Sequence, residues 1–281
     1  MQLLTGNTPL IPIKDFKIWA KIETHNRTGS IKDRMINYIM DVALQYKLVI
    51  PGKTILVEAT SGNTGISLAS YAASLGCECK IIMPSNMSQQ RKDMMKAYGA
   101  EIIETSFNDF MGALDIRNKL LESENYFSPK QFSNPLNIDC HYSTTAPEIY
   151  NQCIDLELDW QTFVHGSGTG GTMMGIKKYI DDHYLNIKCV LTQPAEPNDQ
   201  HGIQGINDGA DFLLDRSLMH EIIEIKTDDA IKRMKQFWET TGVLVGISSG
   251  ANILASELYL EKYNPPGIII TILCDRGERY L

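Results

Sequence analysis

The feature that most constrains the fold of this chain is the alternation of short apolar runs with segments of helical periodicity. We expect strands at residues 18–22, 54–58, 80–83, 101–104, 161–165, 189–192, 221–226, 244–246 and 268–273. We expect helices at residues 32–48, 63–75, 88–98, 108–122, 144–153, 172–181, 228–241 and 251–263. This alternation predicts α/β layers with mostly parallel strands. Since ligands bind beyond the carboxyl ends of such strands, the loops that follow strands are the places to search for a site.

Composition and charge exclude several classes of function. With 281 residues and 43% hydrophobic content, the chain can bury one or two well-packed cores. A net charge of -8 offers no basic surface to nucleic acid, and no apolar run approaches the ~20 residues of a membrane span. The first residues lack the basic region and apolar core of a signal peptide. The six cysteines form no C-x-x-C pair, so we expect reduced thiols, no metal site and a cytoplasmic location.

Lys32, within the stretch 28–34, is the first candidate for catalysis. Ser30 can cap a helix that begins at about Ile31, with Asp33 three residues further on. Lys32 then lies in the first turn, where the positive end of the helix dipole disfavours its charged form. A lysine of that kind is a nucleophilic amine that can form a Schiff base. The alternative is a solvated surface lysine beside a carboxylate.

Two loops rich in hydroxyl and amide side chains join expected strands to expected helices. The first, residues 59–65, directs backbone amides toward a helix N-terminus, which suits an anion such as a carboxylate, and Asn63 adds a side-chain amide. The second, residues 246–252, offers a hydroxyl that could meet a ring nitrogen or an anion. For both loops the alternative is an ordinary capped turn, because Ser, Thr and Asn are the usual capping residues.

A glycine-rich loop, residues 166–172, follows the expected strand at 161–165. Four glycines and several hydroxyl residues at a strand-to-helix junction are typical of a backbone nest for a phosphate. The loop is not a P-loop, and the next expected strand, at 189–192, ends without the acidic residue of a dinucleotide site. We therefore predict that it holds one phosphate group, the alternatives being a ligand-free turn or a nucleotide site.

An imine-forming lysine and a cup for one phosphate together indicate a cofactor. Pyridoxal 5'-phosphate is bound as a lysine Schiff base and carries a single phosphate. The sequence therefore predicts that the chain binds pyridoxal 5'-phosphate.

Five motifs carry a resemblance to a known family: GSIKDR at 29–34, TSGNTG at 60–65, QFSNP at 131–135, GTGGT at 168–172 and GISSGA at 246–251. With these motifs the chain resembles the cysteine synthases, the O-acetylserine sulfhydrylases among the fold-type II pyridoxal-phosphate enzymes. Residues 83–89 and 274–280 are similar to the cysteine synthase B branch, whereas the phosphate loop and residues 202–206 are similar to the A branch.

The resemblance implies a two-lobed α/β fold like that of the tryptophan synthase β subunit, in which each lobe is a mostly parallel sheet flanked by helices. The smaller, mobile lobe would be residues 35–138 and would carry the substrate-carboxylate loop. The larger, cofactor-binding lobe would be residues 1–34 plus 139–281. The resemblance also implies a homodimer.

The resemblance further implies a role for each site residue. Lys32 would hold the cofactor as an internal aldimine and act as the catalytic base. Asn63 would contact the ring oxygen of the cofactor and Ser248 its pyridine nitrogen. The phosphate would be bound by Gly168, Thr169, Gly170, Gly171 and Thr172. The substrate carboxylate would be bound by Thr60, Ser61, Thr64 and Gln131.

The activity that the resemblance implies is β-replacement, which makes L-cysteine from O-acetyl-L-serine and sulfide through an α-aminoacrylate. Three alternatives use the same cofactor: an O-phosphoserine sulfhydrylase, a cystathionine β-synthase and a synthase of another β-substituted alanine. A non-catalytic pyridoxal-phosphate-binding or regulatory paralogue is an alternative of another class.

Overall fold

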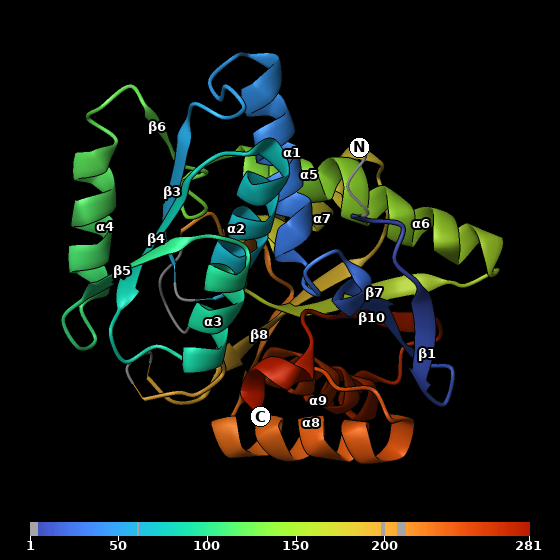
Figure 1. Cartoon of the computed structure of the whole chain (residues 1–281). Helices are drawn as coiled ribbons and strands as arrows, with labels where there is room; N and C mark the ends of the chain where they lie inside the picture. Colours follow the sequence, from blue (N-terminus) through green and yellow to red (C-terminus); the bar gives the residue numbers. More distant parts are fainter. Residues whose placement is uncertain (1–4, 61, 198–199, 207–211) are drawn as a thin grey trace. The chain divides into compact units, whose positions relative to one another are not determined.

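The computed structural model of the chain (Figure 1) describes residues 5–60, 62–197, 200–206 and 212–281. The chain divides into two compact units. The first is Lys32–Asn134, and the second joins the segment that ends at Ile31 to Pro135–Leu281. These bounds differ by a few residues from the lobes expected from the sequence, since Lys32 belongs to the first unit and residues 135–138 to the second.

The second unit is built on a mixed sheet whose described strands have the order β1-β2-β10-β7-β8-β9. The strands are β1 (Leu10–Lys14), β2 (Ile18–Ile22), β7 (Trp160–Gly166), β8 (Lys188–Pro194), β9 (Glu221–Ile225) and β10 (Ile268–Leu273). The β1–β2 pair is antiparallel, and the other four pairs are parallel. The carboxyl ends of β7, β8 and β10 therefore share one edge of the sheet, where ligands bind in folds of this class.

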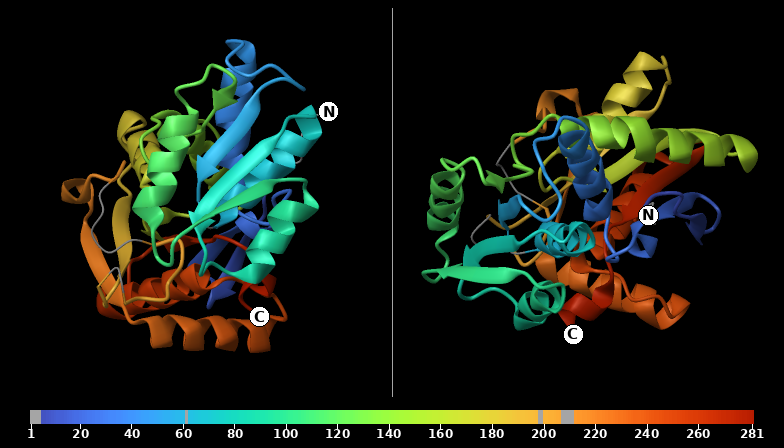
Figure 2. Two further views of the ribbon diagram at one scale, coloured as in Figure 1. Left: turned by 60° about the vertical axis from the view of Figure 1, so that its left-hand side comes forward. Right: turned by 45° about the horizontal axis from the view of Figure 1, so that its top comes forward.

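Helices cover both faces of this larger sheet. They are α5 (Leu136–Cys140), α6 (Ala146–Asp155), α7 (Gly171–Asp182), α8 (Thr227–Thr241) and α9 (Ile247–Tyr263), and α8 and α9 lie side by side (Figures 1 and 2). In β10, Ile270 and Ile272 pack in a cluster that includes Ile176 of α7, whereas Ile269 packs in a cluster that includes Tyr259 of α9. Because successive strand residues point to opposite faces, a strand covered on both sides is apolar along nearly its whole length; the exception in β10 is Thr271, whose hydroxyl donates to Val164 O (2.7 Å).

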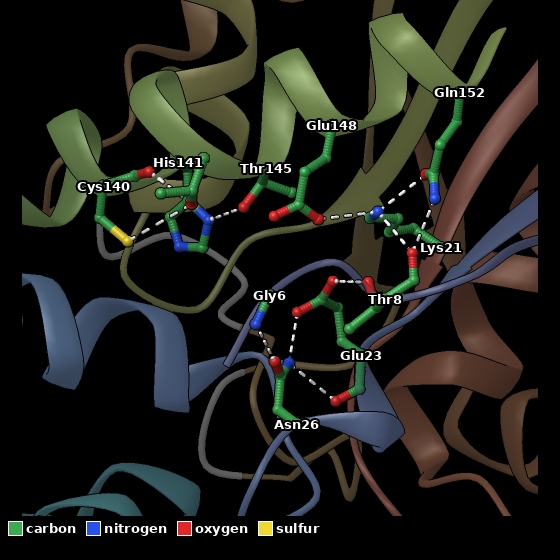
Figure 3. A network of polar contacts seen from close by, with 11 residues as sticks. Gly6, Thr8, Lys21, Glu23, Asn26, Cys140, His141, Thr145, Glu148 and Gln152 are labelled. Atoms are coloured by element: carbon green, nitrogen blue, oxygen red, sulfur yellow. Dashed lines mark hydrogen bonds and ion pairs between the residues drawn. The ribbon is translucent and has the colours of Figure 1, made fainter. Parts of the chain in front are cut away.

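One buried charge interrupts the apolar pattern of β2. Lys21 is fully buried, and its Nζ lies 2.9 Å from Glu148 Oε2 (Figure 3). The same nitrogen donates hydrogen bonds to Thr8 O (2.7 Å) and to Gln152 Oε1 (2.8 Å). Three oxygens around the ammonium offset the cost of removing it from water. This ion pair fastens α6 to the N-terminal segment.

The first unit contains a smaller, parallel sheet with the order β5-β4-β3-β6 among its described strands. The strands are β3 (Ile55–Ala59), β4 (Cys79–Pro84), β5 (Glu101–Thr105) and β6 (Tyr126–Phe127). The helices are α1 (Lys32–Gln45), α2 (Asn63–Leu75), α3 (Gln89–Ala97) and α4 (Phe110–Leu120). Val57 and Ile82 pack in a cluster with Ala113 of α4, while Ile81, the neighbour of Ile82, lies against Gly65 of α2. Each unit is thus an α/β layer structure with a largely parallel sheet, as predicted.

The structure matches several expected elements and corrects others. Strands 18–22 and 268–273 and helix 63–75 have the predicted bounds, and Gly76 ends α2 in the left-handed conformation (φ 64°). The antiparallel strand β1 was missed. Residues 244–246, which we expected to form a strand, contain an isolated bridge between Val245 and Arg276, and α9 begins at Ile247, four residues before the expected start. Among the helices that the structure describes, none has both the length and the apolar character needed to cross a bilayer.

Candidate active site

The glycine-rich loop lies where predicted, between the carboxyl end of β7 at Gly166 and the first turn of α7 at Gly171. Gly170 precedes α7 in the left-handed conformation (φ 94°). A Cβ at Gly168 would lie 2.5 Å from Gly205 O, and a Cβ at Gly170 would overlap the backbone of Leu214. The sequence argument attributed these glycines to an approaching ligand, whereas the structure shows that the chain's own backbone needs the space.

The loop nevertheless presents the groups that bind a phosphate. The first hydrogen bond of α7 runs from Met174 N to Gly170 O (2.9 Å), so the N–H groups of the preceding turn have no acceptor within the helix. Thr169 and Thr172 add two nearly buried hydroxyls. N–H groups at a helix N-terminus together with hydroxyl donors suit a phosphate monoester. The donor set of this loop therefore fits the phosphate of the predicted cofactor.

Ser248 is the second cofactor candidate in the larger unit. It lies in the first turn of α9 rather than in a loop, and its side chain is 4% exposed. Ser249 accepts a hydrogen bond from Cys274 N (2.9 Å), but within the part of the chain that the structure describes no residue bonds to the Ser248 hydroxyl. A serine hydroxyl that no neighbouring residue engages can bond to a ligand. Ser248 therefore fits the predicted contact with a ring nitrogen.

Asn252 links α9 to the start of the phosphate loop, a role that sequence reasoning missed. Its Oδ1 accepts a hydrogen bond from Gly166 N (2.8 Å), and its Nδ2 donates to Ile272 O (3.0 Å). The side chain is fully buried. One amide thus ties α9 to the carboxyl ends of β7 and β10, on the same helix and one turn after Ser248. A single asparagine in a helical pattern carries no sequence signal for such a bond.

The predicted carboxylate loop lies in the first unit, between β3 and α2. Thr60 and Thr64 are buried, Asn63 is the first residue of α2, and Ser61 lies outside the described residues. Thr64 Oγ1 donates a hydrogen bond to Gln131 Oε1 at 2.6 Å. Because that bond occupies the amide oxygen, the amide nitrogen is the group that Gln131 can offer to a carboxylate. The structure therefore brings Gln131 to the loop from far along the chain.

A buried glutamate holds this arrangement together. Glu58 is fully buried near the end of β3, and its Oε1 lies 3.1 Å from Arg117 Nη1. Its carboxylate also accepts hydrogen bonds from Ser128 Oγ (3.3 Å) and Gln131 N (3.3 Å). Burial raises the pKa of the Glu58 carboxyl above its ordinary value, and the Arg117 guanidinium opposes that rise. Glu58 thus fixes the backbone of Gln131 beside the strand that leads into the carboxylate loop.

Lys32 is the first residue of α1 and is half-buried. The segment before it is held by the C-terminal residues, since Ile31 N donates to Cys274 O (2.9 Å) and Arg276 N donates to Gly29 O (3.1 Å). The expectation that Ser30 caps α1 is wrong. Its hydroxyl is buried and has no hydrogen-bond partner among the residues described, because the Ser30 backbone instead forms a bridge with Asp275.

The predicted site residues therefore divide between the two units. Lys32 and the described residues of the carboxylate site, Thr60, Asn63, Thr64 and Gln131, belong to the first unit. The phosphate loop and Ser248 belong to the second. Within each unit the structure brings together residues that are distant in sequence.

Comparison with known proteins identifies the class. The chain belongs to the pyridoxal-phosphate dependent enzyme family, which it matches over residues 1–275. The particular relatives are cysteine synthases: that of Staphylococcus aureus is 36% identical over 296 residues, covering 99% of this chain and 94% of the relative. Cysteine synthase B of Escherichia coli is 36% identical over 289 residues, covering 100% of this chain and 94% of the relative.

Solved structures agree with this assignment. A hydrogen sulfide-producing enzyme from Fusobacterium nucleatum superposes with a TM-score of 0.90 at 36% identity, covering 99% of this chain and 98% of that one. An O-acetylserine dependent cystathionine beta-synthase from Helicobacter pylori gives a TM-score of 0.90 at 28% identity, covering 100% and 97%. The predicted fold class, cofactor and family are thereby confirmed.

Proposed function

We propose that this enzyme makes L-cysteine from O-acetyl-L-serine and sulfide by β-replacement. The observation that carries the proposal is the match to cysteine synthases at 36% identity over 99% of the chain. The donor groups of the phosphate loop and the Ser248 hydroxyl in the first turn of α9 support it independently, because they fit the cofactor of such an enzyme.

Pyridoxal phosphate, when bound, supplies the electron sink that makes the bonds at Cα and Cβ of an amino acid labile. We assign its aldehyde to Lys32, its phosphate to residues 168–172, its ring oxygen to Asn63 and its pyridine nitrogen to Ser248. A neutral serine hydroxyl donates a hydrogen bond to that nitrogen without delivering a full proton, unlike an acid. This choice favours β-elimination over transamination.

The protein's own side chains then bind the substrate and move its proton. Thr60, Ser61, Thr64 and Gln131 bind the α-carboxylate and fix the amino acid. Lys32 removes the Cα proton as the Cβ–O bond breaks and acetate leaves, and it returns a proton to Cα after sulfide sulfur has bonded to Cβ. The reaction transfers no net electrons. The family resemblance implies that the smaller unit moves during the reaction, and such a movement would exclude water during these steps.

The test supplies the pyridoxal-phosphate-loaded protein with sulfide and, in turn, O-acetylserine, O-phosphoserine and serine. We expect cysteine and acetate in equal amounts from O-acetylserine, at a kcat/KM above that of the other two donors. Lys32→Ala should lower kcat by at least about 10²-fold, the usual contribution of a general base. Thr240→Val, which alters an exposed hydroxyl of α8, is the matched control. A wild-type protein that binds the cofactor but consumes none of the three donors would refute the proposal.

A second candidate is release of sulfide from cysteine. It is favoured by the Fusobacterium nucleatum hydrogen sulfide-producing enzyme, which covers this chain almost completely. The same residues serve, because the Cβ bond that breaks is then to sulfur instead of oxygen, and without an added nucleophile water converts the remaining three-carbon fragment to pyruvate and ammonia. Incubating the loaded enzyme with cysteine alone distinguishes the two: a kcat/KM for sulfide release above that for cysteine formation assigns the enzyme to the second role.

We also propose that the enzyme is a cytoplasmic homodimer, as the resemblance implies. All six cysteines are free thiols, which is usual in a reducing compartment. Light scattering coupled to size-exclusion chromatography tests the dimer, and a mass of 31.5 kDa, that of one chain, would contradict it.

A further inference from the structure

A π-helical turn lies beside the phosphate loop. Residues His141–Thr145 form this turn, which connects α5 to α6 without a break in the helix. Single π turns inside α-helices are uncommon and occur frequently at functional sites. Here the turn places His141 Nδ1 2.8 Å from Thr145 Oγ1 on its own segment (Figure 3). The His141 ring is buried, with 2% of the residue exposed.

Asn137 and His141, four residues apart on this helical segment, contact two threonines of the phosphate loop. The threonines are Thr169 and Thr172, three residues apart. Asn137 Nδ2 donates a hydrogen bond to Thr169 Oγ1 (2.9 Å), and His141 Nε2 lies 3.2 Å from Thr172 Oγ1. Residues at this spacing share one helix face. These two contacts, which we call the tethers, therefore join the α5–π segment to the loop that we assign to the phosphate.

Two glycines permit the close approach that the tethers need. A Cβ at Gly175 of α7 would lie 2.6 Å from Ile138 O and 2.7 Å from His141 Cβ. A Cβ at Gly171 would overlap the side-chain amide of Asn137. The face of α7 that lies against the tether residues is thus kept bare of side chains.

The direction of the hydrogen bonds follows from the chemistry of a phosphate. A phosphate monoester dianion only accepts, so Thr172 has to turn its single O–H toward it. Thr172 Oγ1 must then accept from His141, which places the imidazole proton on Nε2. Nδ1 becomes an acceptor, and the Thr145 hydroxyl at 2.8 Å is its donor. Asn137 makes Thr169 Oγ1 an acceptor in the same way, because the amide nitrogen of Asn137 can only donate a hydrogen bond.

We propose that His141 is a positioning residue, held in its Nε2–H tautomer by Thr145, that orients the Thr172 hydroxyl as a donor to the cofactor phosphate. The inference rests on the proposed function, since it takes that phosphate as the ligand of the loop. His141 acts through Thr172 and therefore sets cofactor affinity rather than the bond-making steps.

Two substitutions of similar size separate this role from simple packing. His141→Gln can place an amide N–H where Nε2 lies, whereas His141→Asn ends its polar group near the position of Nδ1 and leaves Thr172 without its donor. The dissociation constants of pyridoxal phosphate and of pyridoxal, which lacks the phosphate, are measured for each protein by equilibrium dialysis. The 31P NMR shift of the bound cofactor gives a second readout on the loaded protein.

We expect His141→Asn to weaken pyridoxal-phosphate binding about tenfold, the loss of one hydrogen bond to a charged assembly, and to change pyridoxal binding less than twofold. His141→Gln should recover most of the affinity. Thr144→Val is the matched control, because its hydroxyl bonds to Cys140 O (2.8 Å) on the same turn, and it should leave both constants unchanged. A 31P shift altered in His141→Asn alone would support the same conclusion.

Equal pyridoxal-phosphate affinity of wild type, His141→Asn and His141→Gln would overturn the inference while leaving the proposed function intact. Failure of the wild-type protein to bind pyridoxal phosphate would overturn both. If His141→Asn does not fold, Thr145→Val decides the question: it removes only the hydroxyl that sets the tautomer, and an unchanged 31P shift and affinity in that variant would refute the role of His141.

Discussion

The contact between α7 and the π-helical segment predicts the effect of one added methyl group. Gly175 lies inside α7, where alanine is intrinsically favoured over glycine by about 1 kcal/mol. The added Cβ of Gly175→Ala would lie 2.6 Å from Ile138 O, 2.7 Å from His141 Cβ and 2.8 Å from Tyr142 N. Two of these three atoms are backbone, so no side-chain rotation relieves the overlap.

The free-energy cost of Gly175→Ala follows from these distances. Ordinary contact begins at 3.4 Å, so the two helical segments must separate by roughly 0.8 Å. Overpacking of this kind costs about 1–3 kcal/mol. The same movement lengthens the 3.2 Å contact between His141 Nε2 and Thr172 Oγ1 to roughly 4 Å, beyond hydrogen-bonding distance, which adds about 1 kcal/mol. Alanine is favoured over glycine inside a helix by about 1 kcal/mol, which offsets part of this cost. We therefore expect Gly175→Ala to lower the free energy of unfolding by about 1–3 kcal/mol.

Urea unfolding of the loaded protein measures this loss, and equilibrium dialysis should show weaker pyridoxal-phosphate binding at the same time. Gly65→Ala in α2 is the control. There an added Cβ would meet Met95 Cε (2.8 Å) and Sδ (3.1 Å), the flexible end of a side chain that can move away, and Ile81 Cγ2 (3.2 Å), which has to shift by only a few tenths of an ångström. Gly65→Ala should stay within about 1 kcal/mol of wild type. A Gly175→Ala protein as stable as wild type, with unchanged cofactor affinity, would show that the packing argument is wrong.

Three further predictions follow from buried polar groups. Lys21→Met should lower the free energy of unfolding, measured with urea, by about 3 kcal/mol, because it leaves the Glu148 carboxylate beside a buried apolar side chain. A loss below about 1 kcal/mol would contradict the structural role of the ion pair. Arg117→Met should raise the pKa of Glu58 further, since burial already raises it and the guanidinium opposes that rise. Below the ordinary value of 4.5 the Glu58 carboxyl is protonated in both folded and unfolded states, so the loss of unfolding free energy in Arg117→Met should be smallest there and should grow as the pH rises from 4.5 through the folded-state pKa of Glu58; a loss independent of pH would refute the assignment. Burial raises the pKa of three thiols to about 12, so iodoacetamide at pH 8 should label them only after unfolding, as followed by mass spectrometry; labelling in the folded protein would contradict their burial. These thiols are Cys79, Cys153 and Cys189.

Local sequence patterns were sufficient for much of the fold. The apolar run at 268–273 predicted β10, and helical periodicity followed by Gly76 predicted both ends of α2. These signals are local because a strand alternates and a helix repeats within a few residues. The positions of the phosphate loop and of Lys32 at a helix start followed from the same reading.

Local patterns failed where a distant partner decides the conformation. Ser30 has the composition of a helix cap, yet its backbone pairs with Asp275 and its hydroxyl is left without a partner in the described part of the chain. The serines at 248 and 249 looked like a loop, but they lie in the first turn of α9. In both places contacts between residues far apart along the chain outweighed weak local preferences.

The sequence by itself determined the class of enzyme, because the residues that we assign to the cofactor occur in short motifs whose residue types reflect its chemistry. Only the tertiary structure decided what holds those motifs in place. It does so through the hydrogen bonds of Asn252 with Gly166, of Glu58 with Gln131 and of His141 with Thr172. Each of these bonds joins segments more than 30 residues apart. Nothing in a residue's immediate neighbours encodes such a bond, since the partner is chosen by how the strands and helices pack.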